Sequence, residues 1–477
     1  MPQLKAGFAK ADITTDKGIV NDRLYAKVLV LDNGTNRVAF ISMDCICLGG
    51  GIGDFSDEIF PNIKALSEKS GIDFVICGTT HTHTPYAMTL EEKEVISRIG
   101  NAVKEALGNM QRVRIGYSSG HENSFIINRT LTLKDGSAST IRQAHPCPRD
   151  EDIARVEFAD DTVNVIKIEC TDGTPICVMF TFGCHPLLGY SNNGVTANFP
   201  GIAERIVKEY TGAEAMMFQS CGGDVTEDEY KNYDIPKSCE KSGTALGLAV
   251  VRVLKEIETD NKNVSLASIT ADFPLRQDFD AVKKKIVCER DRLCGTLGGC
   301  PLNFKAFLPL YMKYLISPDY PLADAYVYIK EKKFGTNHFC EQDEINRKNI
   351  EKYLENLKTM EKLSKLATTL ETLEWHEIHN KSYGASSLSV NITGVRIGDM
   401  LMVTAPVEPL TAIGENIKSF SPFDKTAVIG YANGYMHYGA PADIYNNGGY
   451  ETIECMLAPE WQGVYENGVK KIIKELK

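Results

Sequence analysis

Length, composition and charge exclude several classes of protein. The chain has 477 residues, which is long for one hydrophobic core, and its hydrophobic (43%) and charged (24%) fractions are those of an ordinary globular protein. The formal net charge of −11 argues against nucleic acid and against an anionic membrane surface as partners, because both attract clustered lysine and arginine.

The N-terminus and the cysteines indicate a reducing compartment. Residues Met1 to Gly7 contain no apolar signal region, and no uninterrupted apolar run approaches the length of a transmembrane helix. The 14 cysteines form no Cys-x-x-Cys pair, and several stand in apolar runs. We therefore expect free thiols and a cytoplasmic protein without a transmembrane segment. The oligomeric state is left open.

The first half of the chain alternates predicted strands and helices. Two apolar runs, 28–31 and 38–41, flank Asp32-Asn33-Gly34 and predict a hairpin. A helix is predicted to start at Thr89, with Glu92 completing a capping box. The periodicity further predicts helices over 56–70, 200–212 and 242–258, and strands over 74–77, 163–169, 176–182 and 216–219.

The second half contains a stretch of different composition. Residues 279–366 are rich in Lys, Glu, Tyr and Leu and predict a mostly helical insertion. Beyond it the pattern predicts strands over 386–397 and 401–404 and helices over 408–418 and 468–477. We therefore predict an α/β fold with a mixed β-sheet core flanked by helices, as one domain over 1–477 with this insertion.

Candidate metal ligands follow predicted strands. His81 and His83 come after strand 74–77, and residues i and i+2 of an extended segment point the same way. The chain has only 9 histidines, and His185 directly follows strand 176–182. Glu408 follows strand 401–404, as a ligand or as an acid that complements a helix N-terminus. Imidazole and carboxylate groups are typical zinc ligands.

Two further features leave alternatives open. Tyrosines, glycines and asparagines at 431–450 predict a loop in which a phenol is either a buried ring or, near a dication, a ligand. Asp224 could hydrogen-bond a ligand histidine or cap the loop that follows it, and we favour the structural role.

Several different short motifs occur along the chain in the same order as in one known family. They are Gly7 to Thr14, Leu24-Tyr25-Ala26, Asp44-Cys45, Gly78 to His83, Ile127 to Thr130, Ala197 to Gly201, Gly222 to Val225, Pro406 to Glu408 and Tyr438 to Glu451. In this order they resemble the catalytic N-terminal domain of the neutral, non-lysosomal ceramidases.

The resemblance implies an activity and a set of site residues. It implies one zinc ion, hydrolysis of a C–N amide bond by an activated water, and a small-molecule amide substrate. The implied zinc ligands are His81, His185, Glu408 and Tyr438. The residues implied to assist the reaction are His83, Arg129 and Tyr450.

The chain also departs from the family pattern. Thr84-Pro85-Tyr86 and Thr226-Glu227 replace family residues near the motifs, and we expect no secretory signal and no C-terminal immunoglobulin-like domain. These departures leave the implied ligands in place but allow a substrate other than ceramide, such as a small acylated amide.

Several alternatives share these residues. Mixed nitrogen and oxygen ligands also suit iron, cobalt or manganese. A metal-dependent esterase, or a non-catalytic ligand-binding protein that keeps the fold, would carry the same ligand set. A barrel amidohydrolase would place its His-x-His at the first strand, whereas here at least three strand signals precede it.

Overall fold

The chain is divided into two units. The computed structural model describes residues 4–83, 88–141, 148–319, 325–446 and 448–477. Unit 1 comprises Met1–Gln277 and His379–Lys477, and unit 2 comprises Asp278–Ile378.

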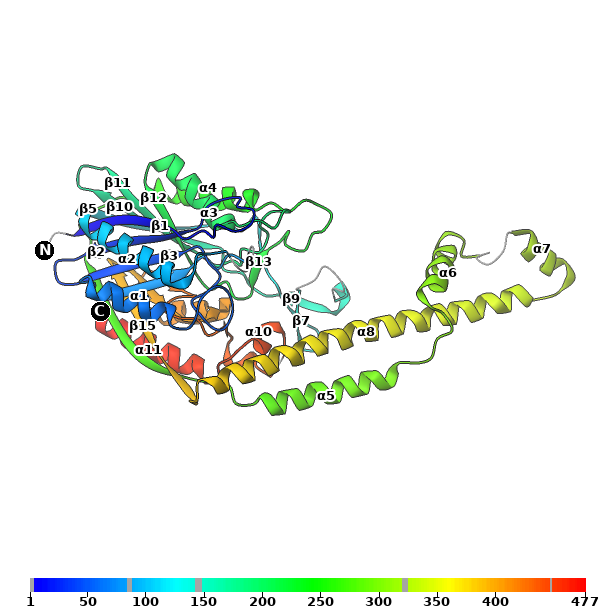
Figure 1. The fold of residues 1–477 in the computed structure, drawn as a ribbon. Coiled ribbons are helices and arrows are strands. Elements are labelled where there is room, and N and C mark those ends of the chain that lie inside the picture. The colour runs from blue at the N-terminus through cyan, green and yellow to red at the C-terminus, as the bar shows by residue number, and fades with distance from the viewer. Residues whose placement is uncertain (1–3, 84–87, 142–147, 320–324, 447) are drawn as a thin grey trace. The chain divides into compact units, whose positions relative to one another are not determined.

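Two mixed sheets form the centre of unit 1 (Figure 1). The larger sheet has the order β12-β11-β10-β5-β1-β2-β3-β4, and the smaller has the order β14-β15-β16-β18. The pairs β3–β4, β11–β12 and β16–β18 are parallel, and the other pairs are antiparallel, so the mixed α/β architecture predicted from the sequence is confirmed.

Eight of these twelve strands match predicted apolar runs, whereas β1, β5, β14 and β18 were not predicted. The larger sheet consists of β1 (Lys5–Asp12), β2 (Tyr25–Asp32), β3 (Arg37–Met43), β4 (Phe74–Thr79), β5 (Gln111–His121), β10 (Thr162–Cys170), β11 (Pro175–Phe182) and β12 (Glu214–Gln219). The smaller sheet consists of β14 (Val264–Pro274), β15 (Ser387–Ile397), β16 (Met400–Thr404) and β18 (Lys425–Ile429).

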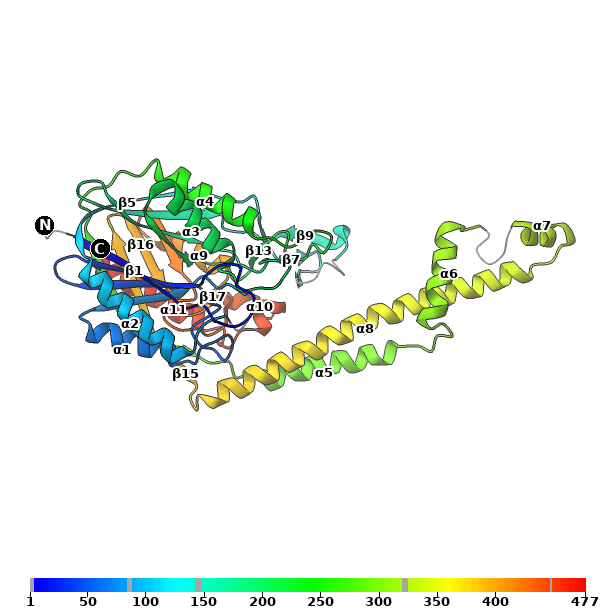
Figure 2. The same cartoon turned by 45° about the horizontal axis from the view of Figure 1, so that its top comes forward.

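Side-chain alternation along the strands separates the layers. In β2, Val28 packs with the helices outside the larger sheet, whereas Leu29 packs in the core between the two sheets. In β16, Met402 lies in that shared core, whereas Val403 packs against helices on the outer side of the smaller sheet. Unit 1 is therefore a sandwich of helices, sheet, sheet and helices (Figure 2).

Helices cover both outer faces of this sandwich. The larger sheet is covered by α1 (Ile59–Lys69), α2 (Glu92–Gly108), α3 (Asn198–Thr211) and α4 (Glu240–Leu254), and the smaller by α9 (Thr411–Phe420) and α11 (Trp461–Leu476). The predicted capping box of α2 is wrong. The helix begins at Glu92 after Glu91, and the Thr89 hydroxyl donates to Asp54 Oδ2 at 3.1 Å.

The larger sheet curls until β12, at one edge, approaches β3, which lies next to the opposite edge. Ser42 Oγ of β3 donates to the carbonyl oxygen of Met217 in β12 at 2.5 Å, although these strands are far apart in the sheet order. The curl brings the loops that follow β4 and β11 to the same end of unit 1, where the candidate ligands lie.

Small ladders surround this end of the sandwich. The elements are β6 (Ile126–Asn128) with β13 (Val225–Glu227), β17 (Glu408–Pro409) with β19 (Tyr438–Gly439), and β7 (Thr130–Leu133) with β8 (Ala138–Thr140) and β9 (Ile153–Val156). The remaining elements of unit 1 are the short helix α10 (Tyr450–Ile453) and two single-turn 3-10 helices, Asp150–Asp152 and Ala442–Ile444.

Unit 2 is helical over its described residues. It contains α5 (Phe279–Thr296), α6 (Phe304–Ile316), α7 (Ala325–Phe334) and most of α8 (His338–Ser382). Helix α8 continues past residue 366, where we expected the insertion to end. None of the helices in the described ranges has both the length and the apolar character that a membrane crossing requires.

Candidate metal centre

His81 lies in a strained turn directly after β4. The strand ends at Thr79, and His81 has φ of +61°, a left-handed conformation that is costly for a residue with a side chain. The extended segment that we expected to align His81 with His83 is therefore absent. Nevertheless, the turn brings the two rings to a centroid distance of 4.4 Å.

His185 reaches the same place from the end of β11. Its ring centroid is 4.8 Å from that of His81, and both side chains are at most 1% exposed. Gln219, at the end of β12, holds the two loops together, because its Nε2 donates to the carbonyl oxygens of Thr80 at 2.9 Å and Cys184 at 2.8 Å. No sequence pattern pointed to Gln219 beyond its place at the end of a predicted strand.

Glu408 belongs to a short strand rather than to a helix N-terminus. It begins β17, while α9 starts only at Thr411, so its interpretation as a helix acid is wrong. In the parallel ladder of β17 and β19, Glu408 is directly paired with Tyr438. Tyr435 donates its hydroxyl to Glu408 Oε1. This ladder brings two of the predicted ligands side by side.

The tautomers of the two buried histidines follow from their carbonyl partners. Nδ1 of His81 is 2.7 Å from the Ile46 carbonyl oxygen, and Nδ1 of His185 is 2.7 Å from the Gly222 carbonyl oxygen. A carbonyl can only accept, so each Nδ1 carries a proton, and a ring that is neutral then has its lone pair on Nε2. Burial lowers the pKa of His81 to about 4, which keeps that ring neutral.

These lone pairs face a carboxylate oxygen. Glu408 Oε2 is 3.0 Å from His185 Nε2 and 3.5 Å from His81 Nε2, yet it has no hydrogen-bond partner among the residues that the structure describes. A carboxylate oxygen and two imidazole nitrogens that converge in a buried place fit a cation. The donor set therefore suits zinc or a similar divalent metal.

His83 is the partly exposed member of the cluster. Its Nε2 is 2.9 Å from His81 Nε2, and one ligand atom from each of His81, His83 and His185 lies within 4.8 Å of the others. Burial and the neighbouring imidazoles hold the pKa of His83 well below its usual range. His83 is thus placed either to bind a metal as a third imidazole or to work beside it.

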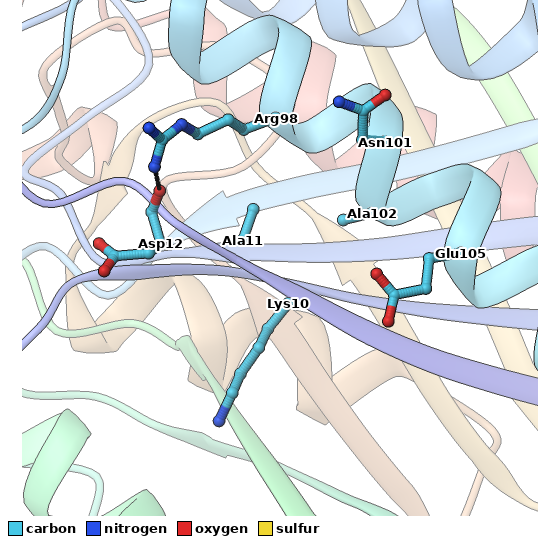
Figure 3. A pocket seen from close by; sticks show the side chains of 7 residues that line it. All are labelled: Lys10, Ala11, Asp12, Arg98, Asn101, Ala102 and Glu105. Atoms are coloured by element: carbon cyan, nitrogen blue, oxygen red, sulfur yellow. Dashed lines mark hydrogen bonds between the residues drawn. The ribbon is translucent and has the colours of Figure 1, made fainter.

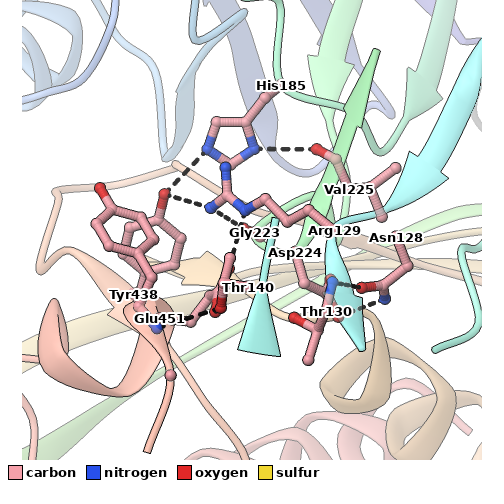
Figure 4. A network of polar contacts seen from close by, with 12 residues as sticks. Asn128, Arg129, Thr130, Thr140, His185, Gly223, Asp224, Val225, Tyr438 and Glu451 are labelled. Carbon is pink, nitrogen blue, oxygen red and sulfur yellow. Dashed lines mark hydrogen bonds and ion pairs between the residues drawn. The ribbon is translucent and has the colours of Figure 1, made fainter. Parts of the chain in front are cut away.

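Arg129 connects the candidate ligands to a second buried carboxylate (Figure 4). Its Nη2 donates to the Tyr438 hydroxyl at 2.8 Å and to the Gly223 carbonyl at 2.7 Å, while its Nε donates to Glu451 Oε1 at 2.8 Å. The Tyr438 hydroxyl is also 3.2 Å from His185 Nε2. Burial raises the pKa of Tyr438 well above its usual range, and the Arg129 charge opposes that rise.

Tyr450 borders this network at the start of α10. Its ring is T-shaped to that of Tyr438 at a centroid distance of 5.5 Å, and the Arg129 guanidinium lies 5.4 Å from its ring centroid. The structure thus places His81, His83, His185, Glu408, Tyr438, Arg129 and Tyr450 around one region of unit 1.

Asp224 has a structural role in this region. Its Oδ1 accepts from the backbone N–H and the hydroxyl of Thr411, both at 2.8 Å, at the first turn of α9. Its Oδ2 accepts from Asn128 Nδ2 at 2.8 Å (Figure 4). Its side chain therefore joins the small ladders to α9.

A surface cavity elsewhere in unit 1 shares no residue with this centre. It has a volume of about 270 Å³ and lies between β1 and α2, where Lys10, Asp12, Arg98 and Glu105 contribute to its lining (Figure 3). Arg98 Nη1 donates to the Asp12 carbonyl at 2.7 Å across its edge.

The architecture is a neutral ceramidase-like fold, which confirms at the level of fold the resemblance found in the sequence. Two solved structures match 100% of this chain and 75% of their own length: the neutral ceramidase from Pseudomonas aeruginosa and a ceramidase complexed with C2. Each has a TM-score of 0.61 and 14% sequence identity. No family model matches the chain. At this identity the comparison establishes the fold, and the activity has to be argued from the site.

Proposed function

We propose that this chain is a zinc-dependent hydrolase that cleaves an amide bond in a small acylated or lipid-derived molecule. The main support is the Glu408 Oε2 atom, which has no hydrogen-bond partner among the described residues and faces the Nε2 atoms of two buried histidines. The ceramidase-like fold supports the amide as the bond that is cut.

In this proposal, His81, His185, Glu408 and Tyr438 hold the cation. A bound divalent cation lowers the pKa of a water molecule and polarises a carbonyl group. The protein's part is to orient the ligands. The Ile46 and Gly222 carbonyls fix the two ring tautomers.

His83 would serve as the proton carrier. It is the partly exposed histidine of the cluster, and a neutral imidazole can take a proton from the attacking water and give it to the leaving nitrogen. Burial and the neighbouring imidazoles lower its pKa, which keeps the ring in the accepting form.

Tyr450 and Arg129 would stabilise the developing oxyanion. Loss of one such donor costs about 3–4 kcal/mol in other enzymes. Because Nε and Nη2 of Arg129 are engaged with Glu451, Gly223 and Tyr438, its contribution to the oxyanion would come from Nη1. We propose the cytoplasm as the compartment, supported by the free thiols of the described cysteines.

Two alanine variants test the roles of the histidines. We expect His81→Ala to lose bound zinc and hydrolysis together, and His83→Ala to keep zinc and lose turnover. Elemental analysis after dialysis gives the metal content, and hydrolysis of short-chain ceramide and small N-acyl amides gives the activity. Full metal content in both variants would contradict the ligand set, and loss of metal from His83→Ala would instead favour three imidazole ligands.

Matched substrates test the type of bond. Ester analogues with the same acyl chain should be cut more slowly than the amides if the protein is an amidase, and faster hydrolysis of the esters would favour the esterase alternative. Stoichiometric zinc with no turnover of either series would favour a non-catalytic ligand-binding protein.

A further inference from the structure

Helix α6 of unit 2 has two apolar sides. One side packs on α8, where Phe307 and Tyr314 of α6 form a buried cluster with Ile350. The other side is open. Its large apolar side chains are exposed by 43 to 79%, and they are Phe304, Leu308, Met312, Leu315 and Ile316, which we name the α6 face.

The spacing of these residues makes the α6 face continuous. Residues 304, 308, 312 and 315 recur every three or four positions, so they lie along one side of the helix, and 316 widens the stripe at its end. An apolar stripe of this kind on a helix surface usually marks an interaction site, whereas single exposed hydrophobic residues do not.

The charge of the segment that carries the α6 face is entirely positive. From Pro301 to Pro318 the sequence contains no Asp or Glu, although the whole chain has 63 of them. The only charged residues in this stretch are Lys305 and Lys313, and both are exposed. The local balance is thus opposite to the net charge of −11, which argued against an anionic surface for the chain as a whole.

Helix α7 has a similar composition. Tyr326 is 81% and Phe334 is 66% exposed, and the lysines of α7, Lys330, Lys332 and Lys333, are exposed as well. Its one acid, Glu331, is buried and accepts from the backbone N–H of Phe339 at 2.9 Å. Exposed aromatic side chains beside lysines are typical of segments that lie in a membrane interface.

We propose that the α6 face docks on the surface of a bilayer that contains anionic lipid, with α6 lying in the plane of the interface. At 13 residues, α6 is too short to cross the membrane, but this length suits a helix that lies on it. A second copy of the chain is a poorer occupant. Each side of a stable protein interface contributes about 20–30 residues, whereas the α6 face offers five large apolar side chains. The apolar side chains enter the headgroup region while Lys305 and Lys313 contact lipid phosphates.

Flotation of the full chain with vesicles tests this surface. We expect binding to vesicles of phosphatidylcholine with phosphatidylserine, weaker binding to phosphatidylcholine alone, and release by high salt. Leu308→Ser with Leu315→Ser should reduce the bound fraction about tenfold, and Lys305→Glu with Lys313→Glu should remove the preference for phosphatidylserine. The matched control is Tyr210→Ser, which changes a 65% exposed side chain in unit 1 and should bind as the unchanged chain does.

Three results would overturn the proposal. The first is that the unchanged chain floats with neither type of vesicle. The second is that the serine double variant floats to the same extent as the unchanged chain. The third is that light scattering shows the unchanged chain to be a dimer and the serine double variant to be a monomer. The last would assign the α6 face to a second copy. Circular dichroism checks that each variant keeps its helices. Removal of metal with a chelator should leave the fraction of protein that floats with vesicles unchanged, so this test is independent of the proposed hydrolysis.

Discussion

The buried ion pair of Arg129 and Glu451 should have a large coupling free energy. The two side chains are 6% and 4% exposed, and their N···O distance is 2.8 Å. We expect a double-mutant cycle with Arg129→Met and Glu451→Gln to give a coupling of about 3–5 kcal/mol, because each single change leaves a buried charged or polar partner behind.

The magnitude follows from the environment of the pair. Two unit charges about 4 Å apart interact by about 4 kcal/mol at an effective dielectric constant of 20. Glu451 also accepts from the Thr140 hydroxyl at 2.8 Å, and Arg129 also donates to Gly223 and Tyr438, so both charges are held in place. The conformational entropy lost in fixing the two side chains is therefore largely offset by these other contacts.

The assay is urea unfolding of the metal-free protein, followed by fluorescence. The matched control is Arg98 with Glu94 on α2, whose N···O distance is shorter, 2.6 Å, but whose side chains are 41% and 49% exposed. Solvent screens such a pair, and we expect a coupling of only about 0.3–0.5 kcal/mol there.

Similar couplings for the two pairs would refute this reasoning, since burial would then have no influence. A coupling near zero for Arg129 and Glu451 would mean that the pair is hydrated in solution. Zinc affinity measured on the same variants gives a second result. Loss of Glu451 should weaken binding, because Arg129 would no longer be held against Tyr438.

Three further outcomes follow from the described contacts. Tyr435→Phe removes the donor to Glu408 Oε1 and should weaken zinc binding about 10–100-fold, as measured by competition with a chelating dye. Adding zinc to chelated protein should raise the unfolding temperature in calorimetry, since binding at 100 times Kd adds about 2.7 kcal/mol. Burial raises the pKa of Glu227 from 4.5 to about 7, so its contribution to stability is full below pH 4.5 and is lost as the pH rises through about 7. Glu227→Gln should therefore remove about 3 kcal/mol of this pH dependence, as measured by urea unfolding across that range.

Matched variants control these experiments. Tyr431→Phe keeps the ring that contacts His81 and should bind zinc as the unchanged protein does. An equal loss of affinity in both tyrosine variants would contradict a specific role for the Tyr435 hydroxyl. Asp228→Asn removes an exposed neighbouring charge that adds only a minor part to the rise of the Glu227 pKa, so it should reduce the pH dependence far less than Glu227→Gln does. If Glu227→Gln behaves like Asp228→Asn, the carboxyl of Glu227 is not desolvated.

The sequence was sufficient for the principal helices of unit 1 and for eight strands of its two main sheets, but not for β1, β5, β14 and β18 or for the small ladders. The turn at Asp32-Asn33-Gly34 and the apolar runs beside it predicted β2 and β3, because alternation and turn chemistry are local properties. The capping box at Thr89 failed because the hydroxyl of this residue bonds Asp54, which lies 35 positions away. A local motif could not reveal a competing partner at that separation.

The candidate site was predictable as a set of residues but not as an arrangement. His81, His185 and Glu408 each follow an apolar strand, so their chemistry and their positions at strand ends could be read along the chain. Their convergence depends on the curl of the larger sheet and on Gln219, which joins two loops by hydrogen bonds.

The contact between Arg129 and Glu451 spans 322 positions of sequence. The sequence determined which side chains can bind a cation, because that property belongs to each residue. The tertiary structure alone decided that their lone pairs meet, because the direction of a side chain at a strand end depends on how distant strands pack.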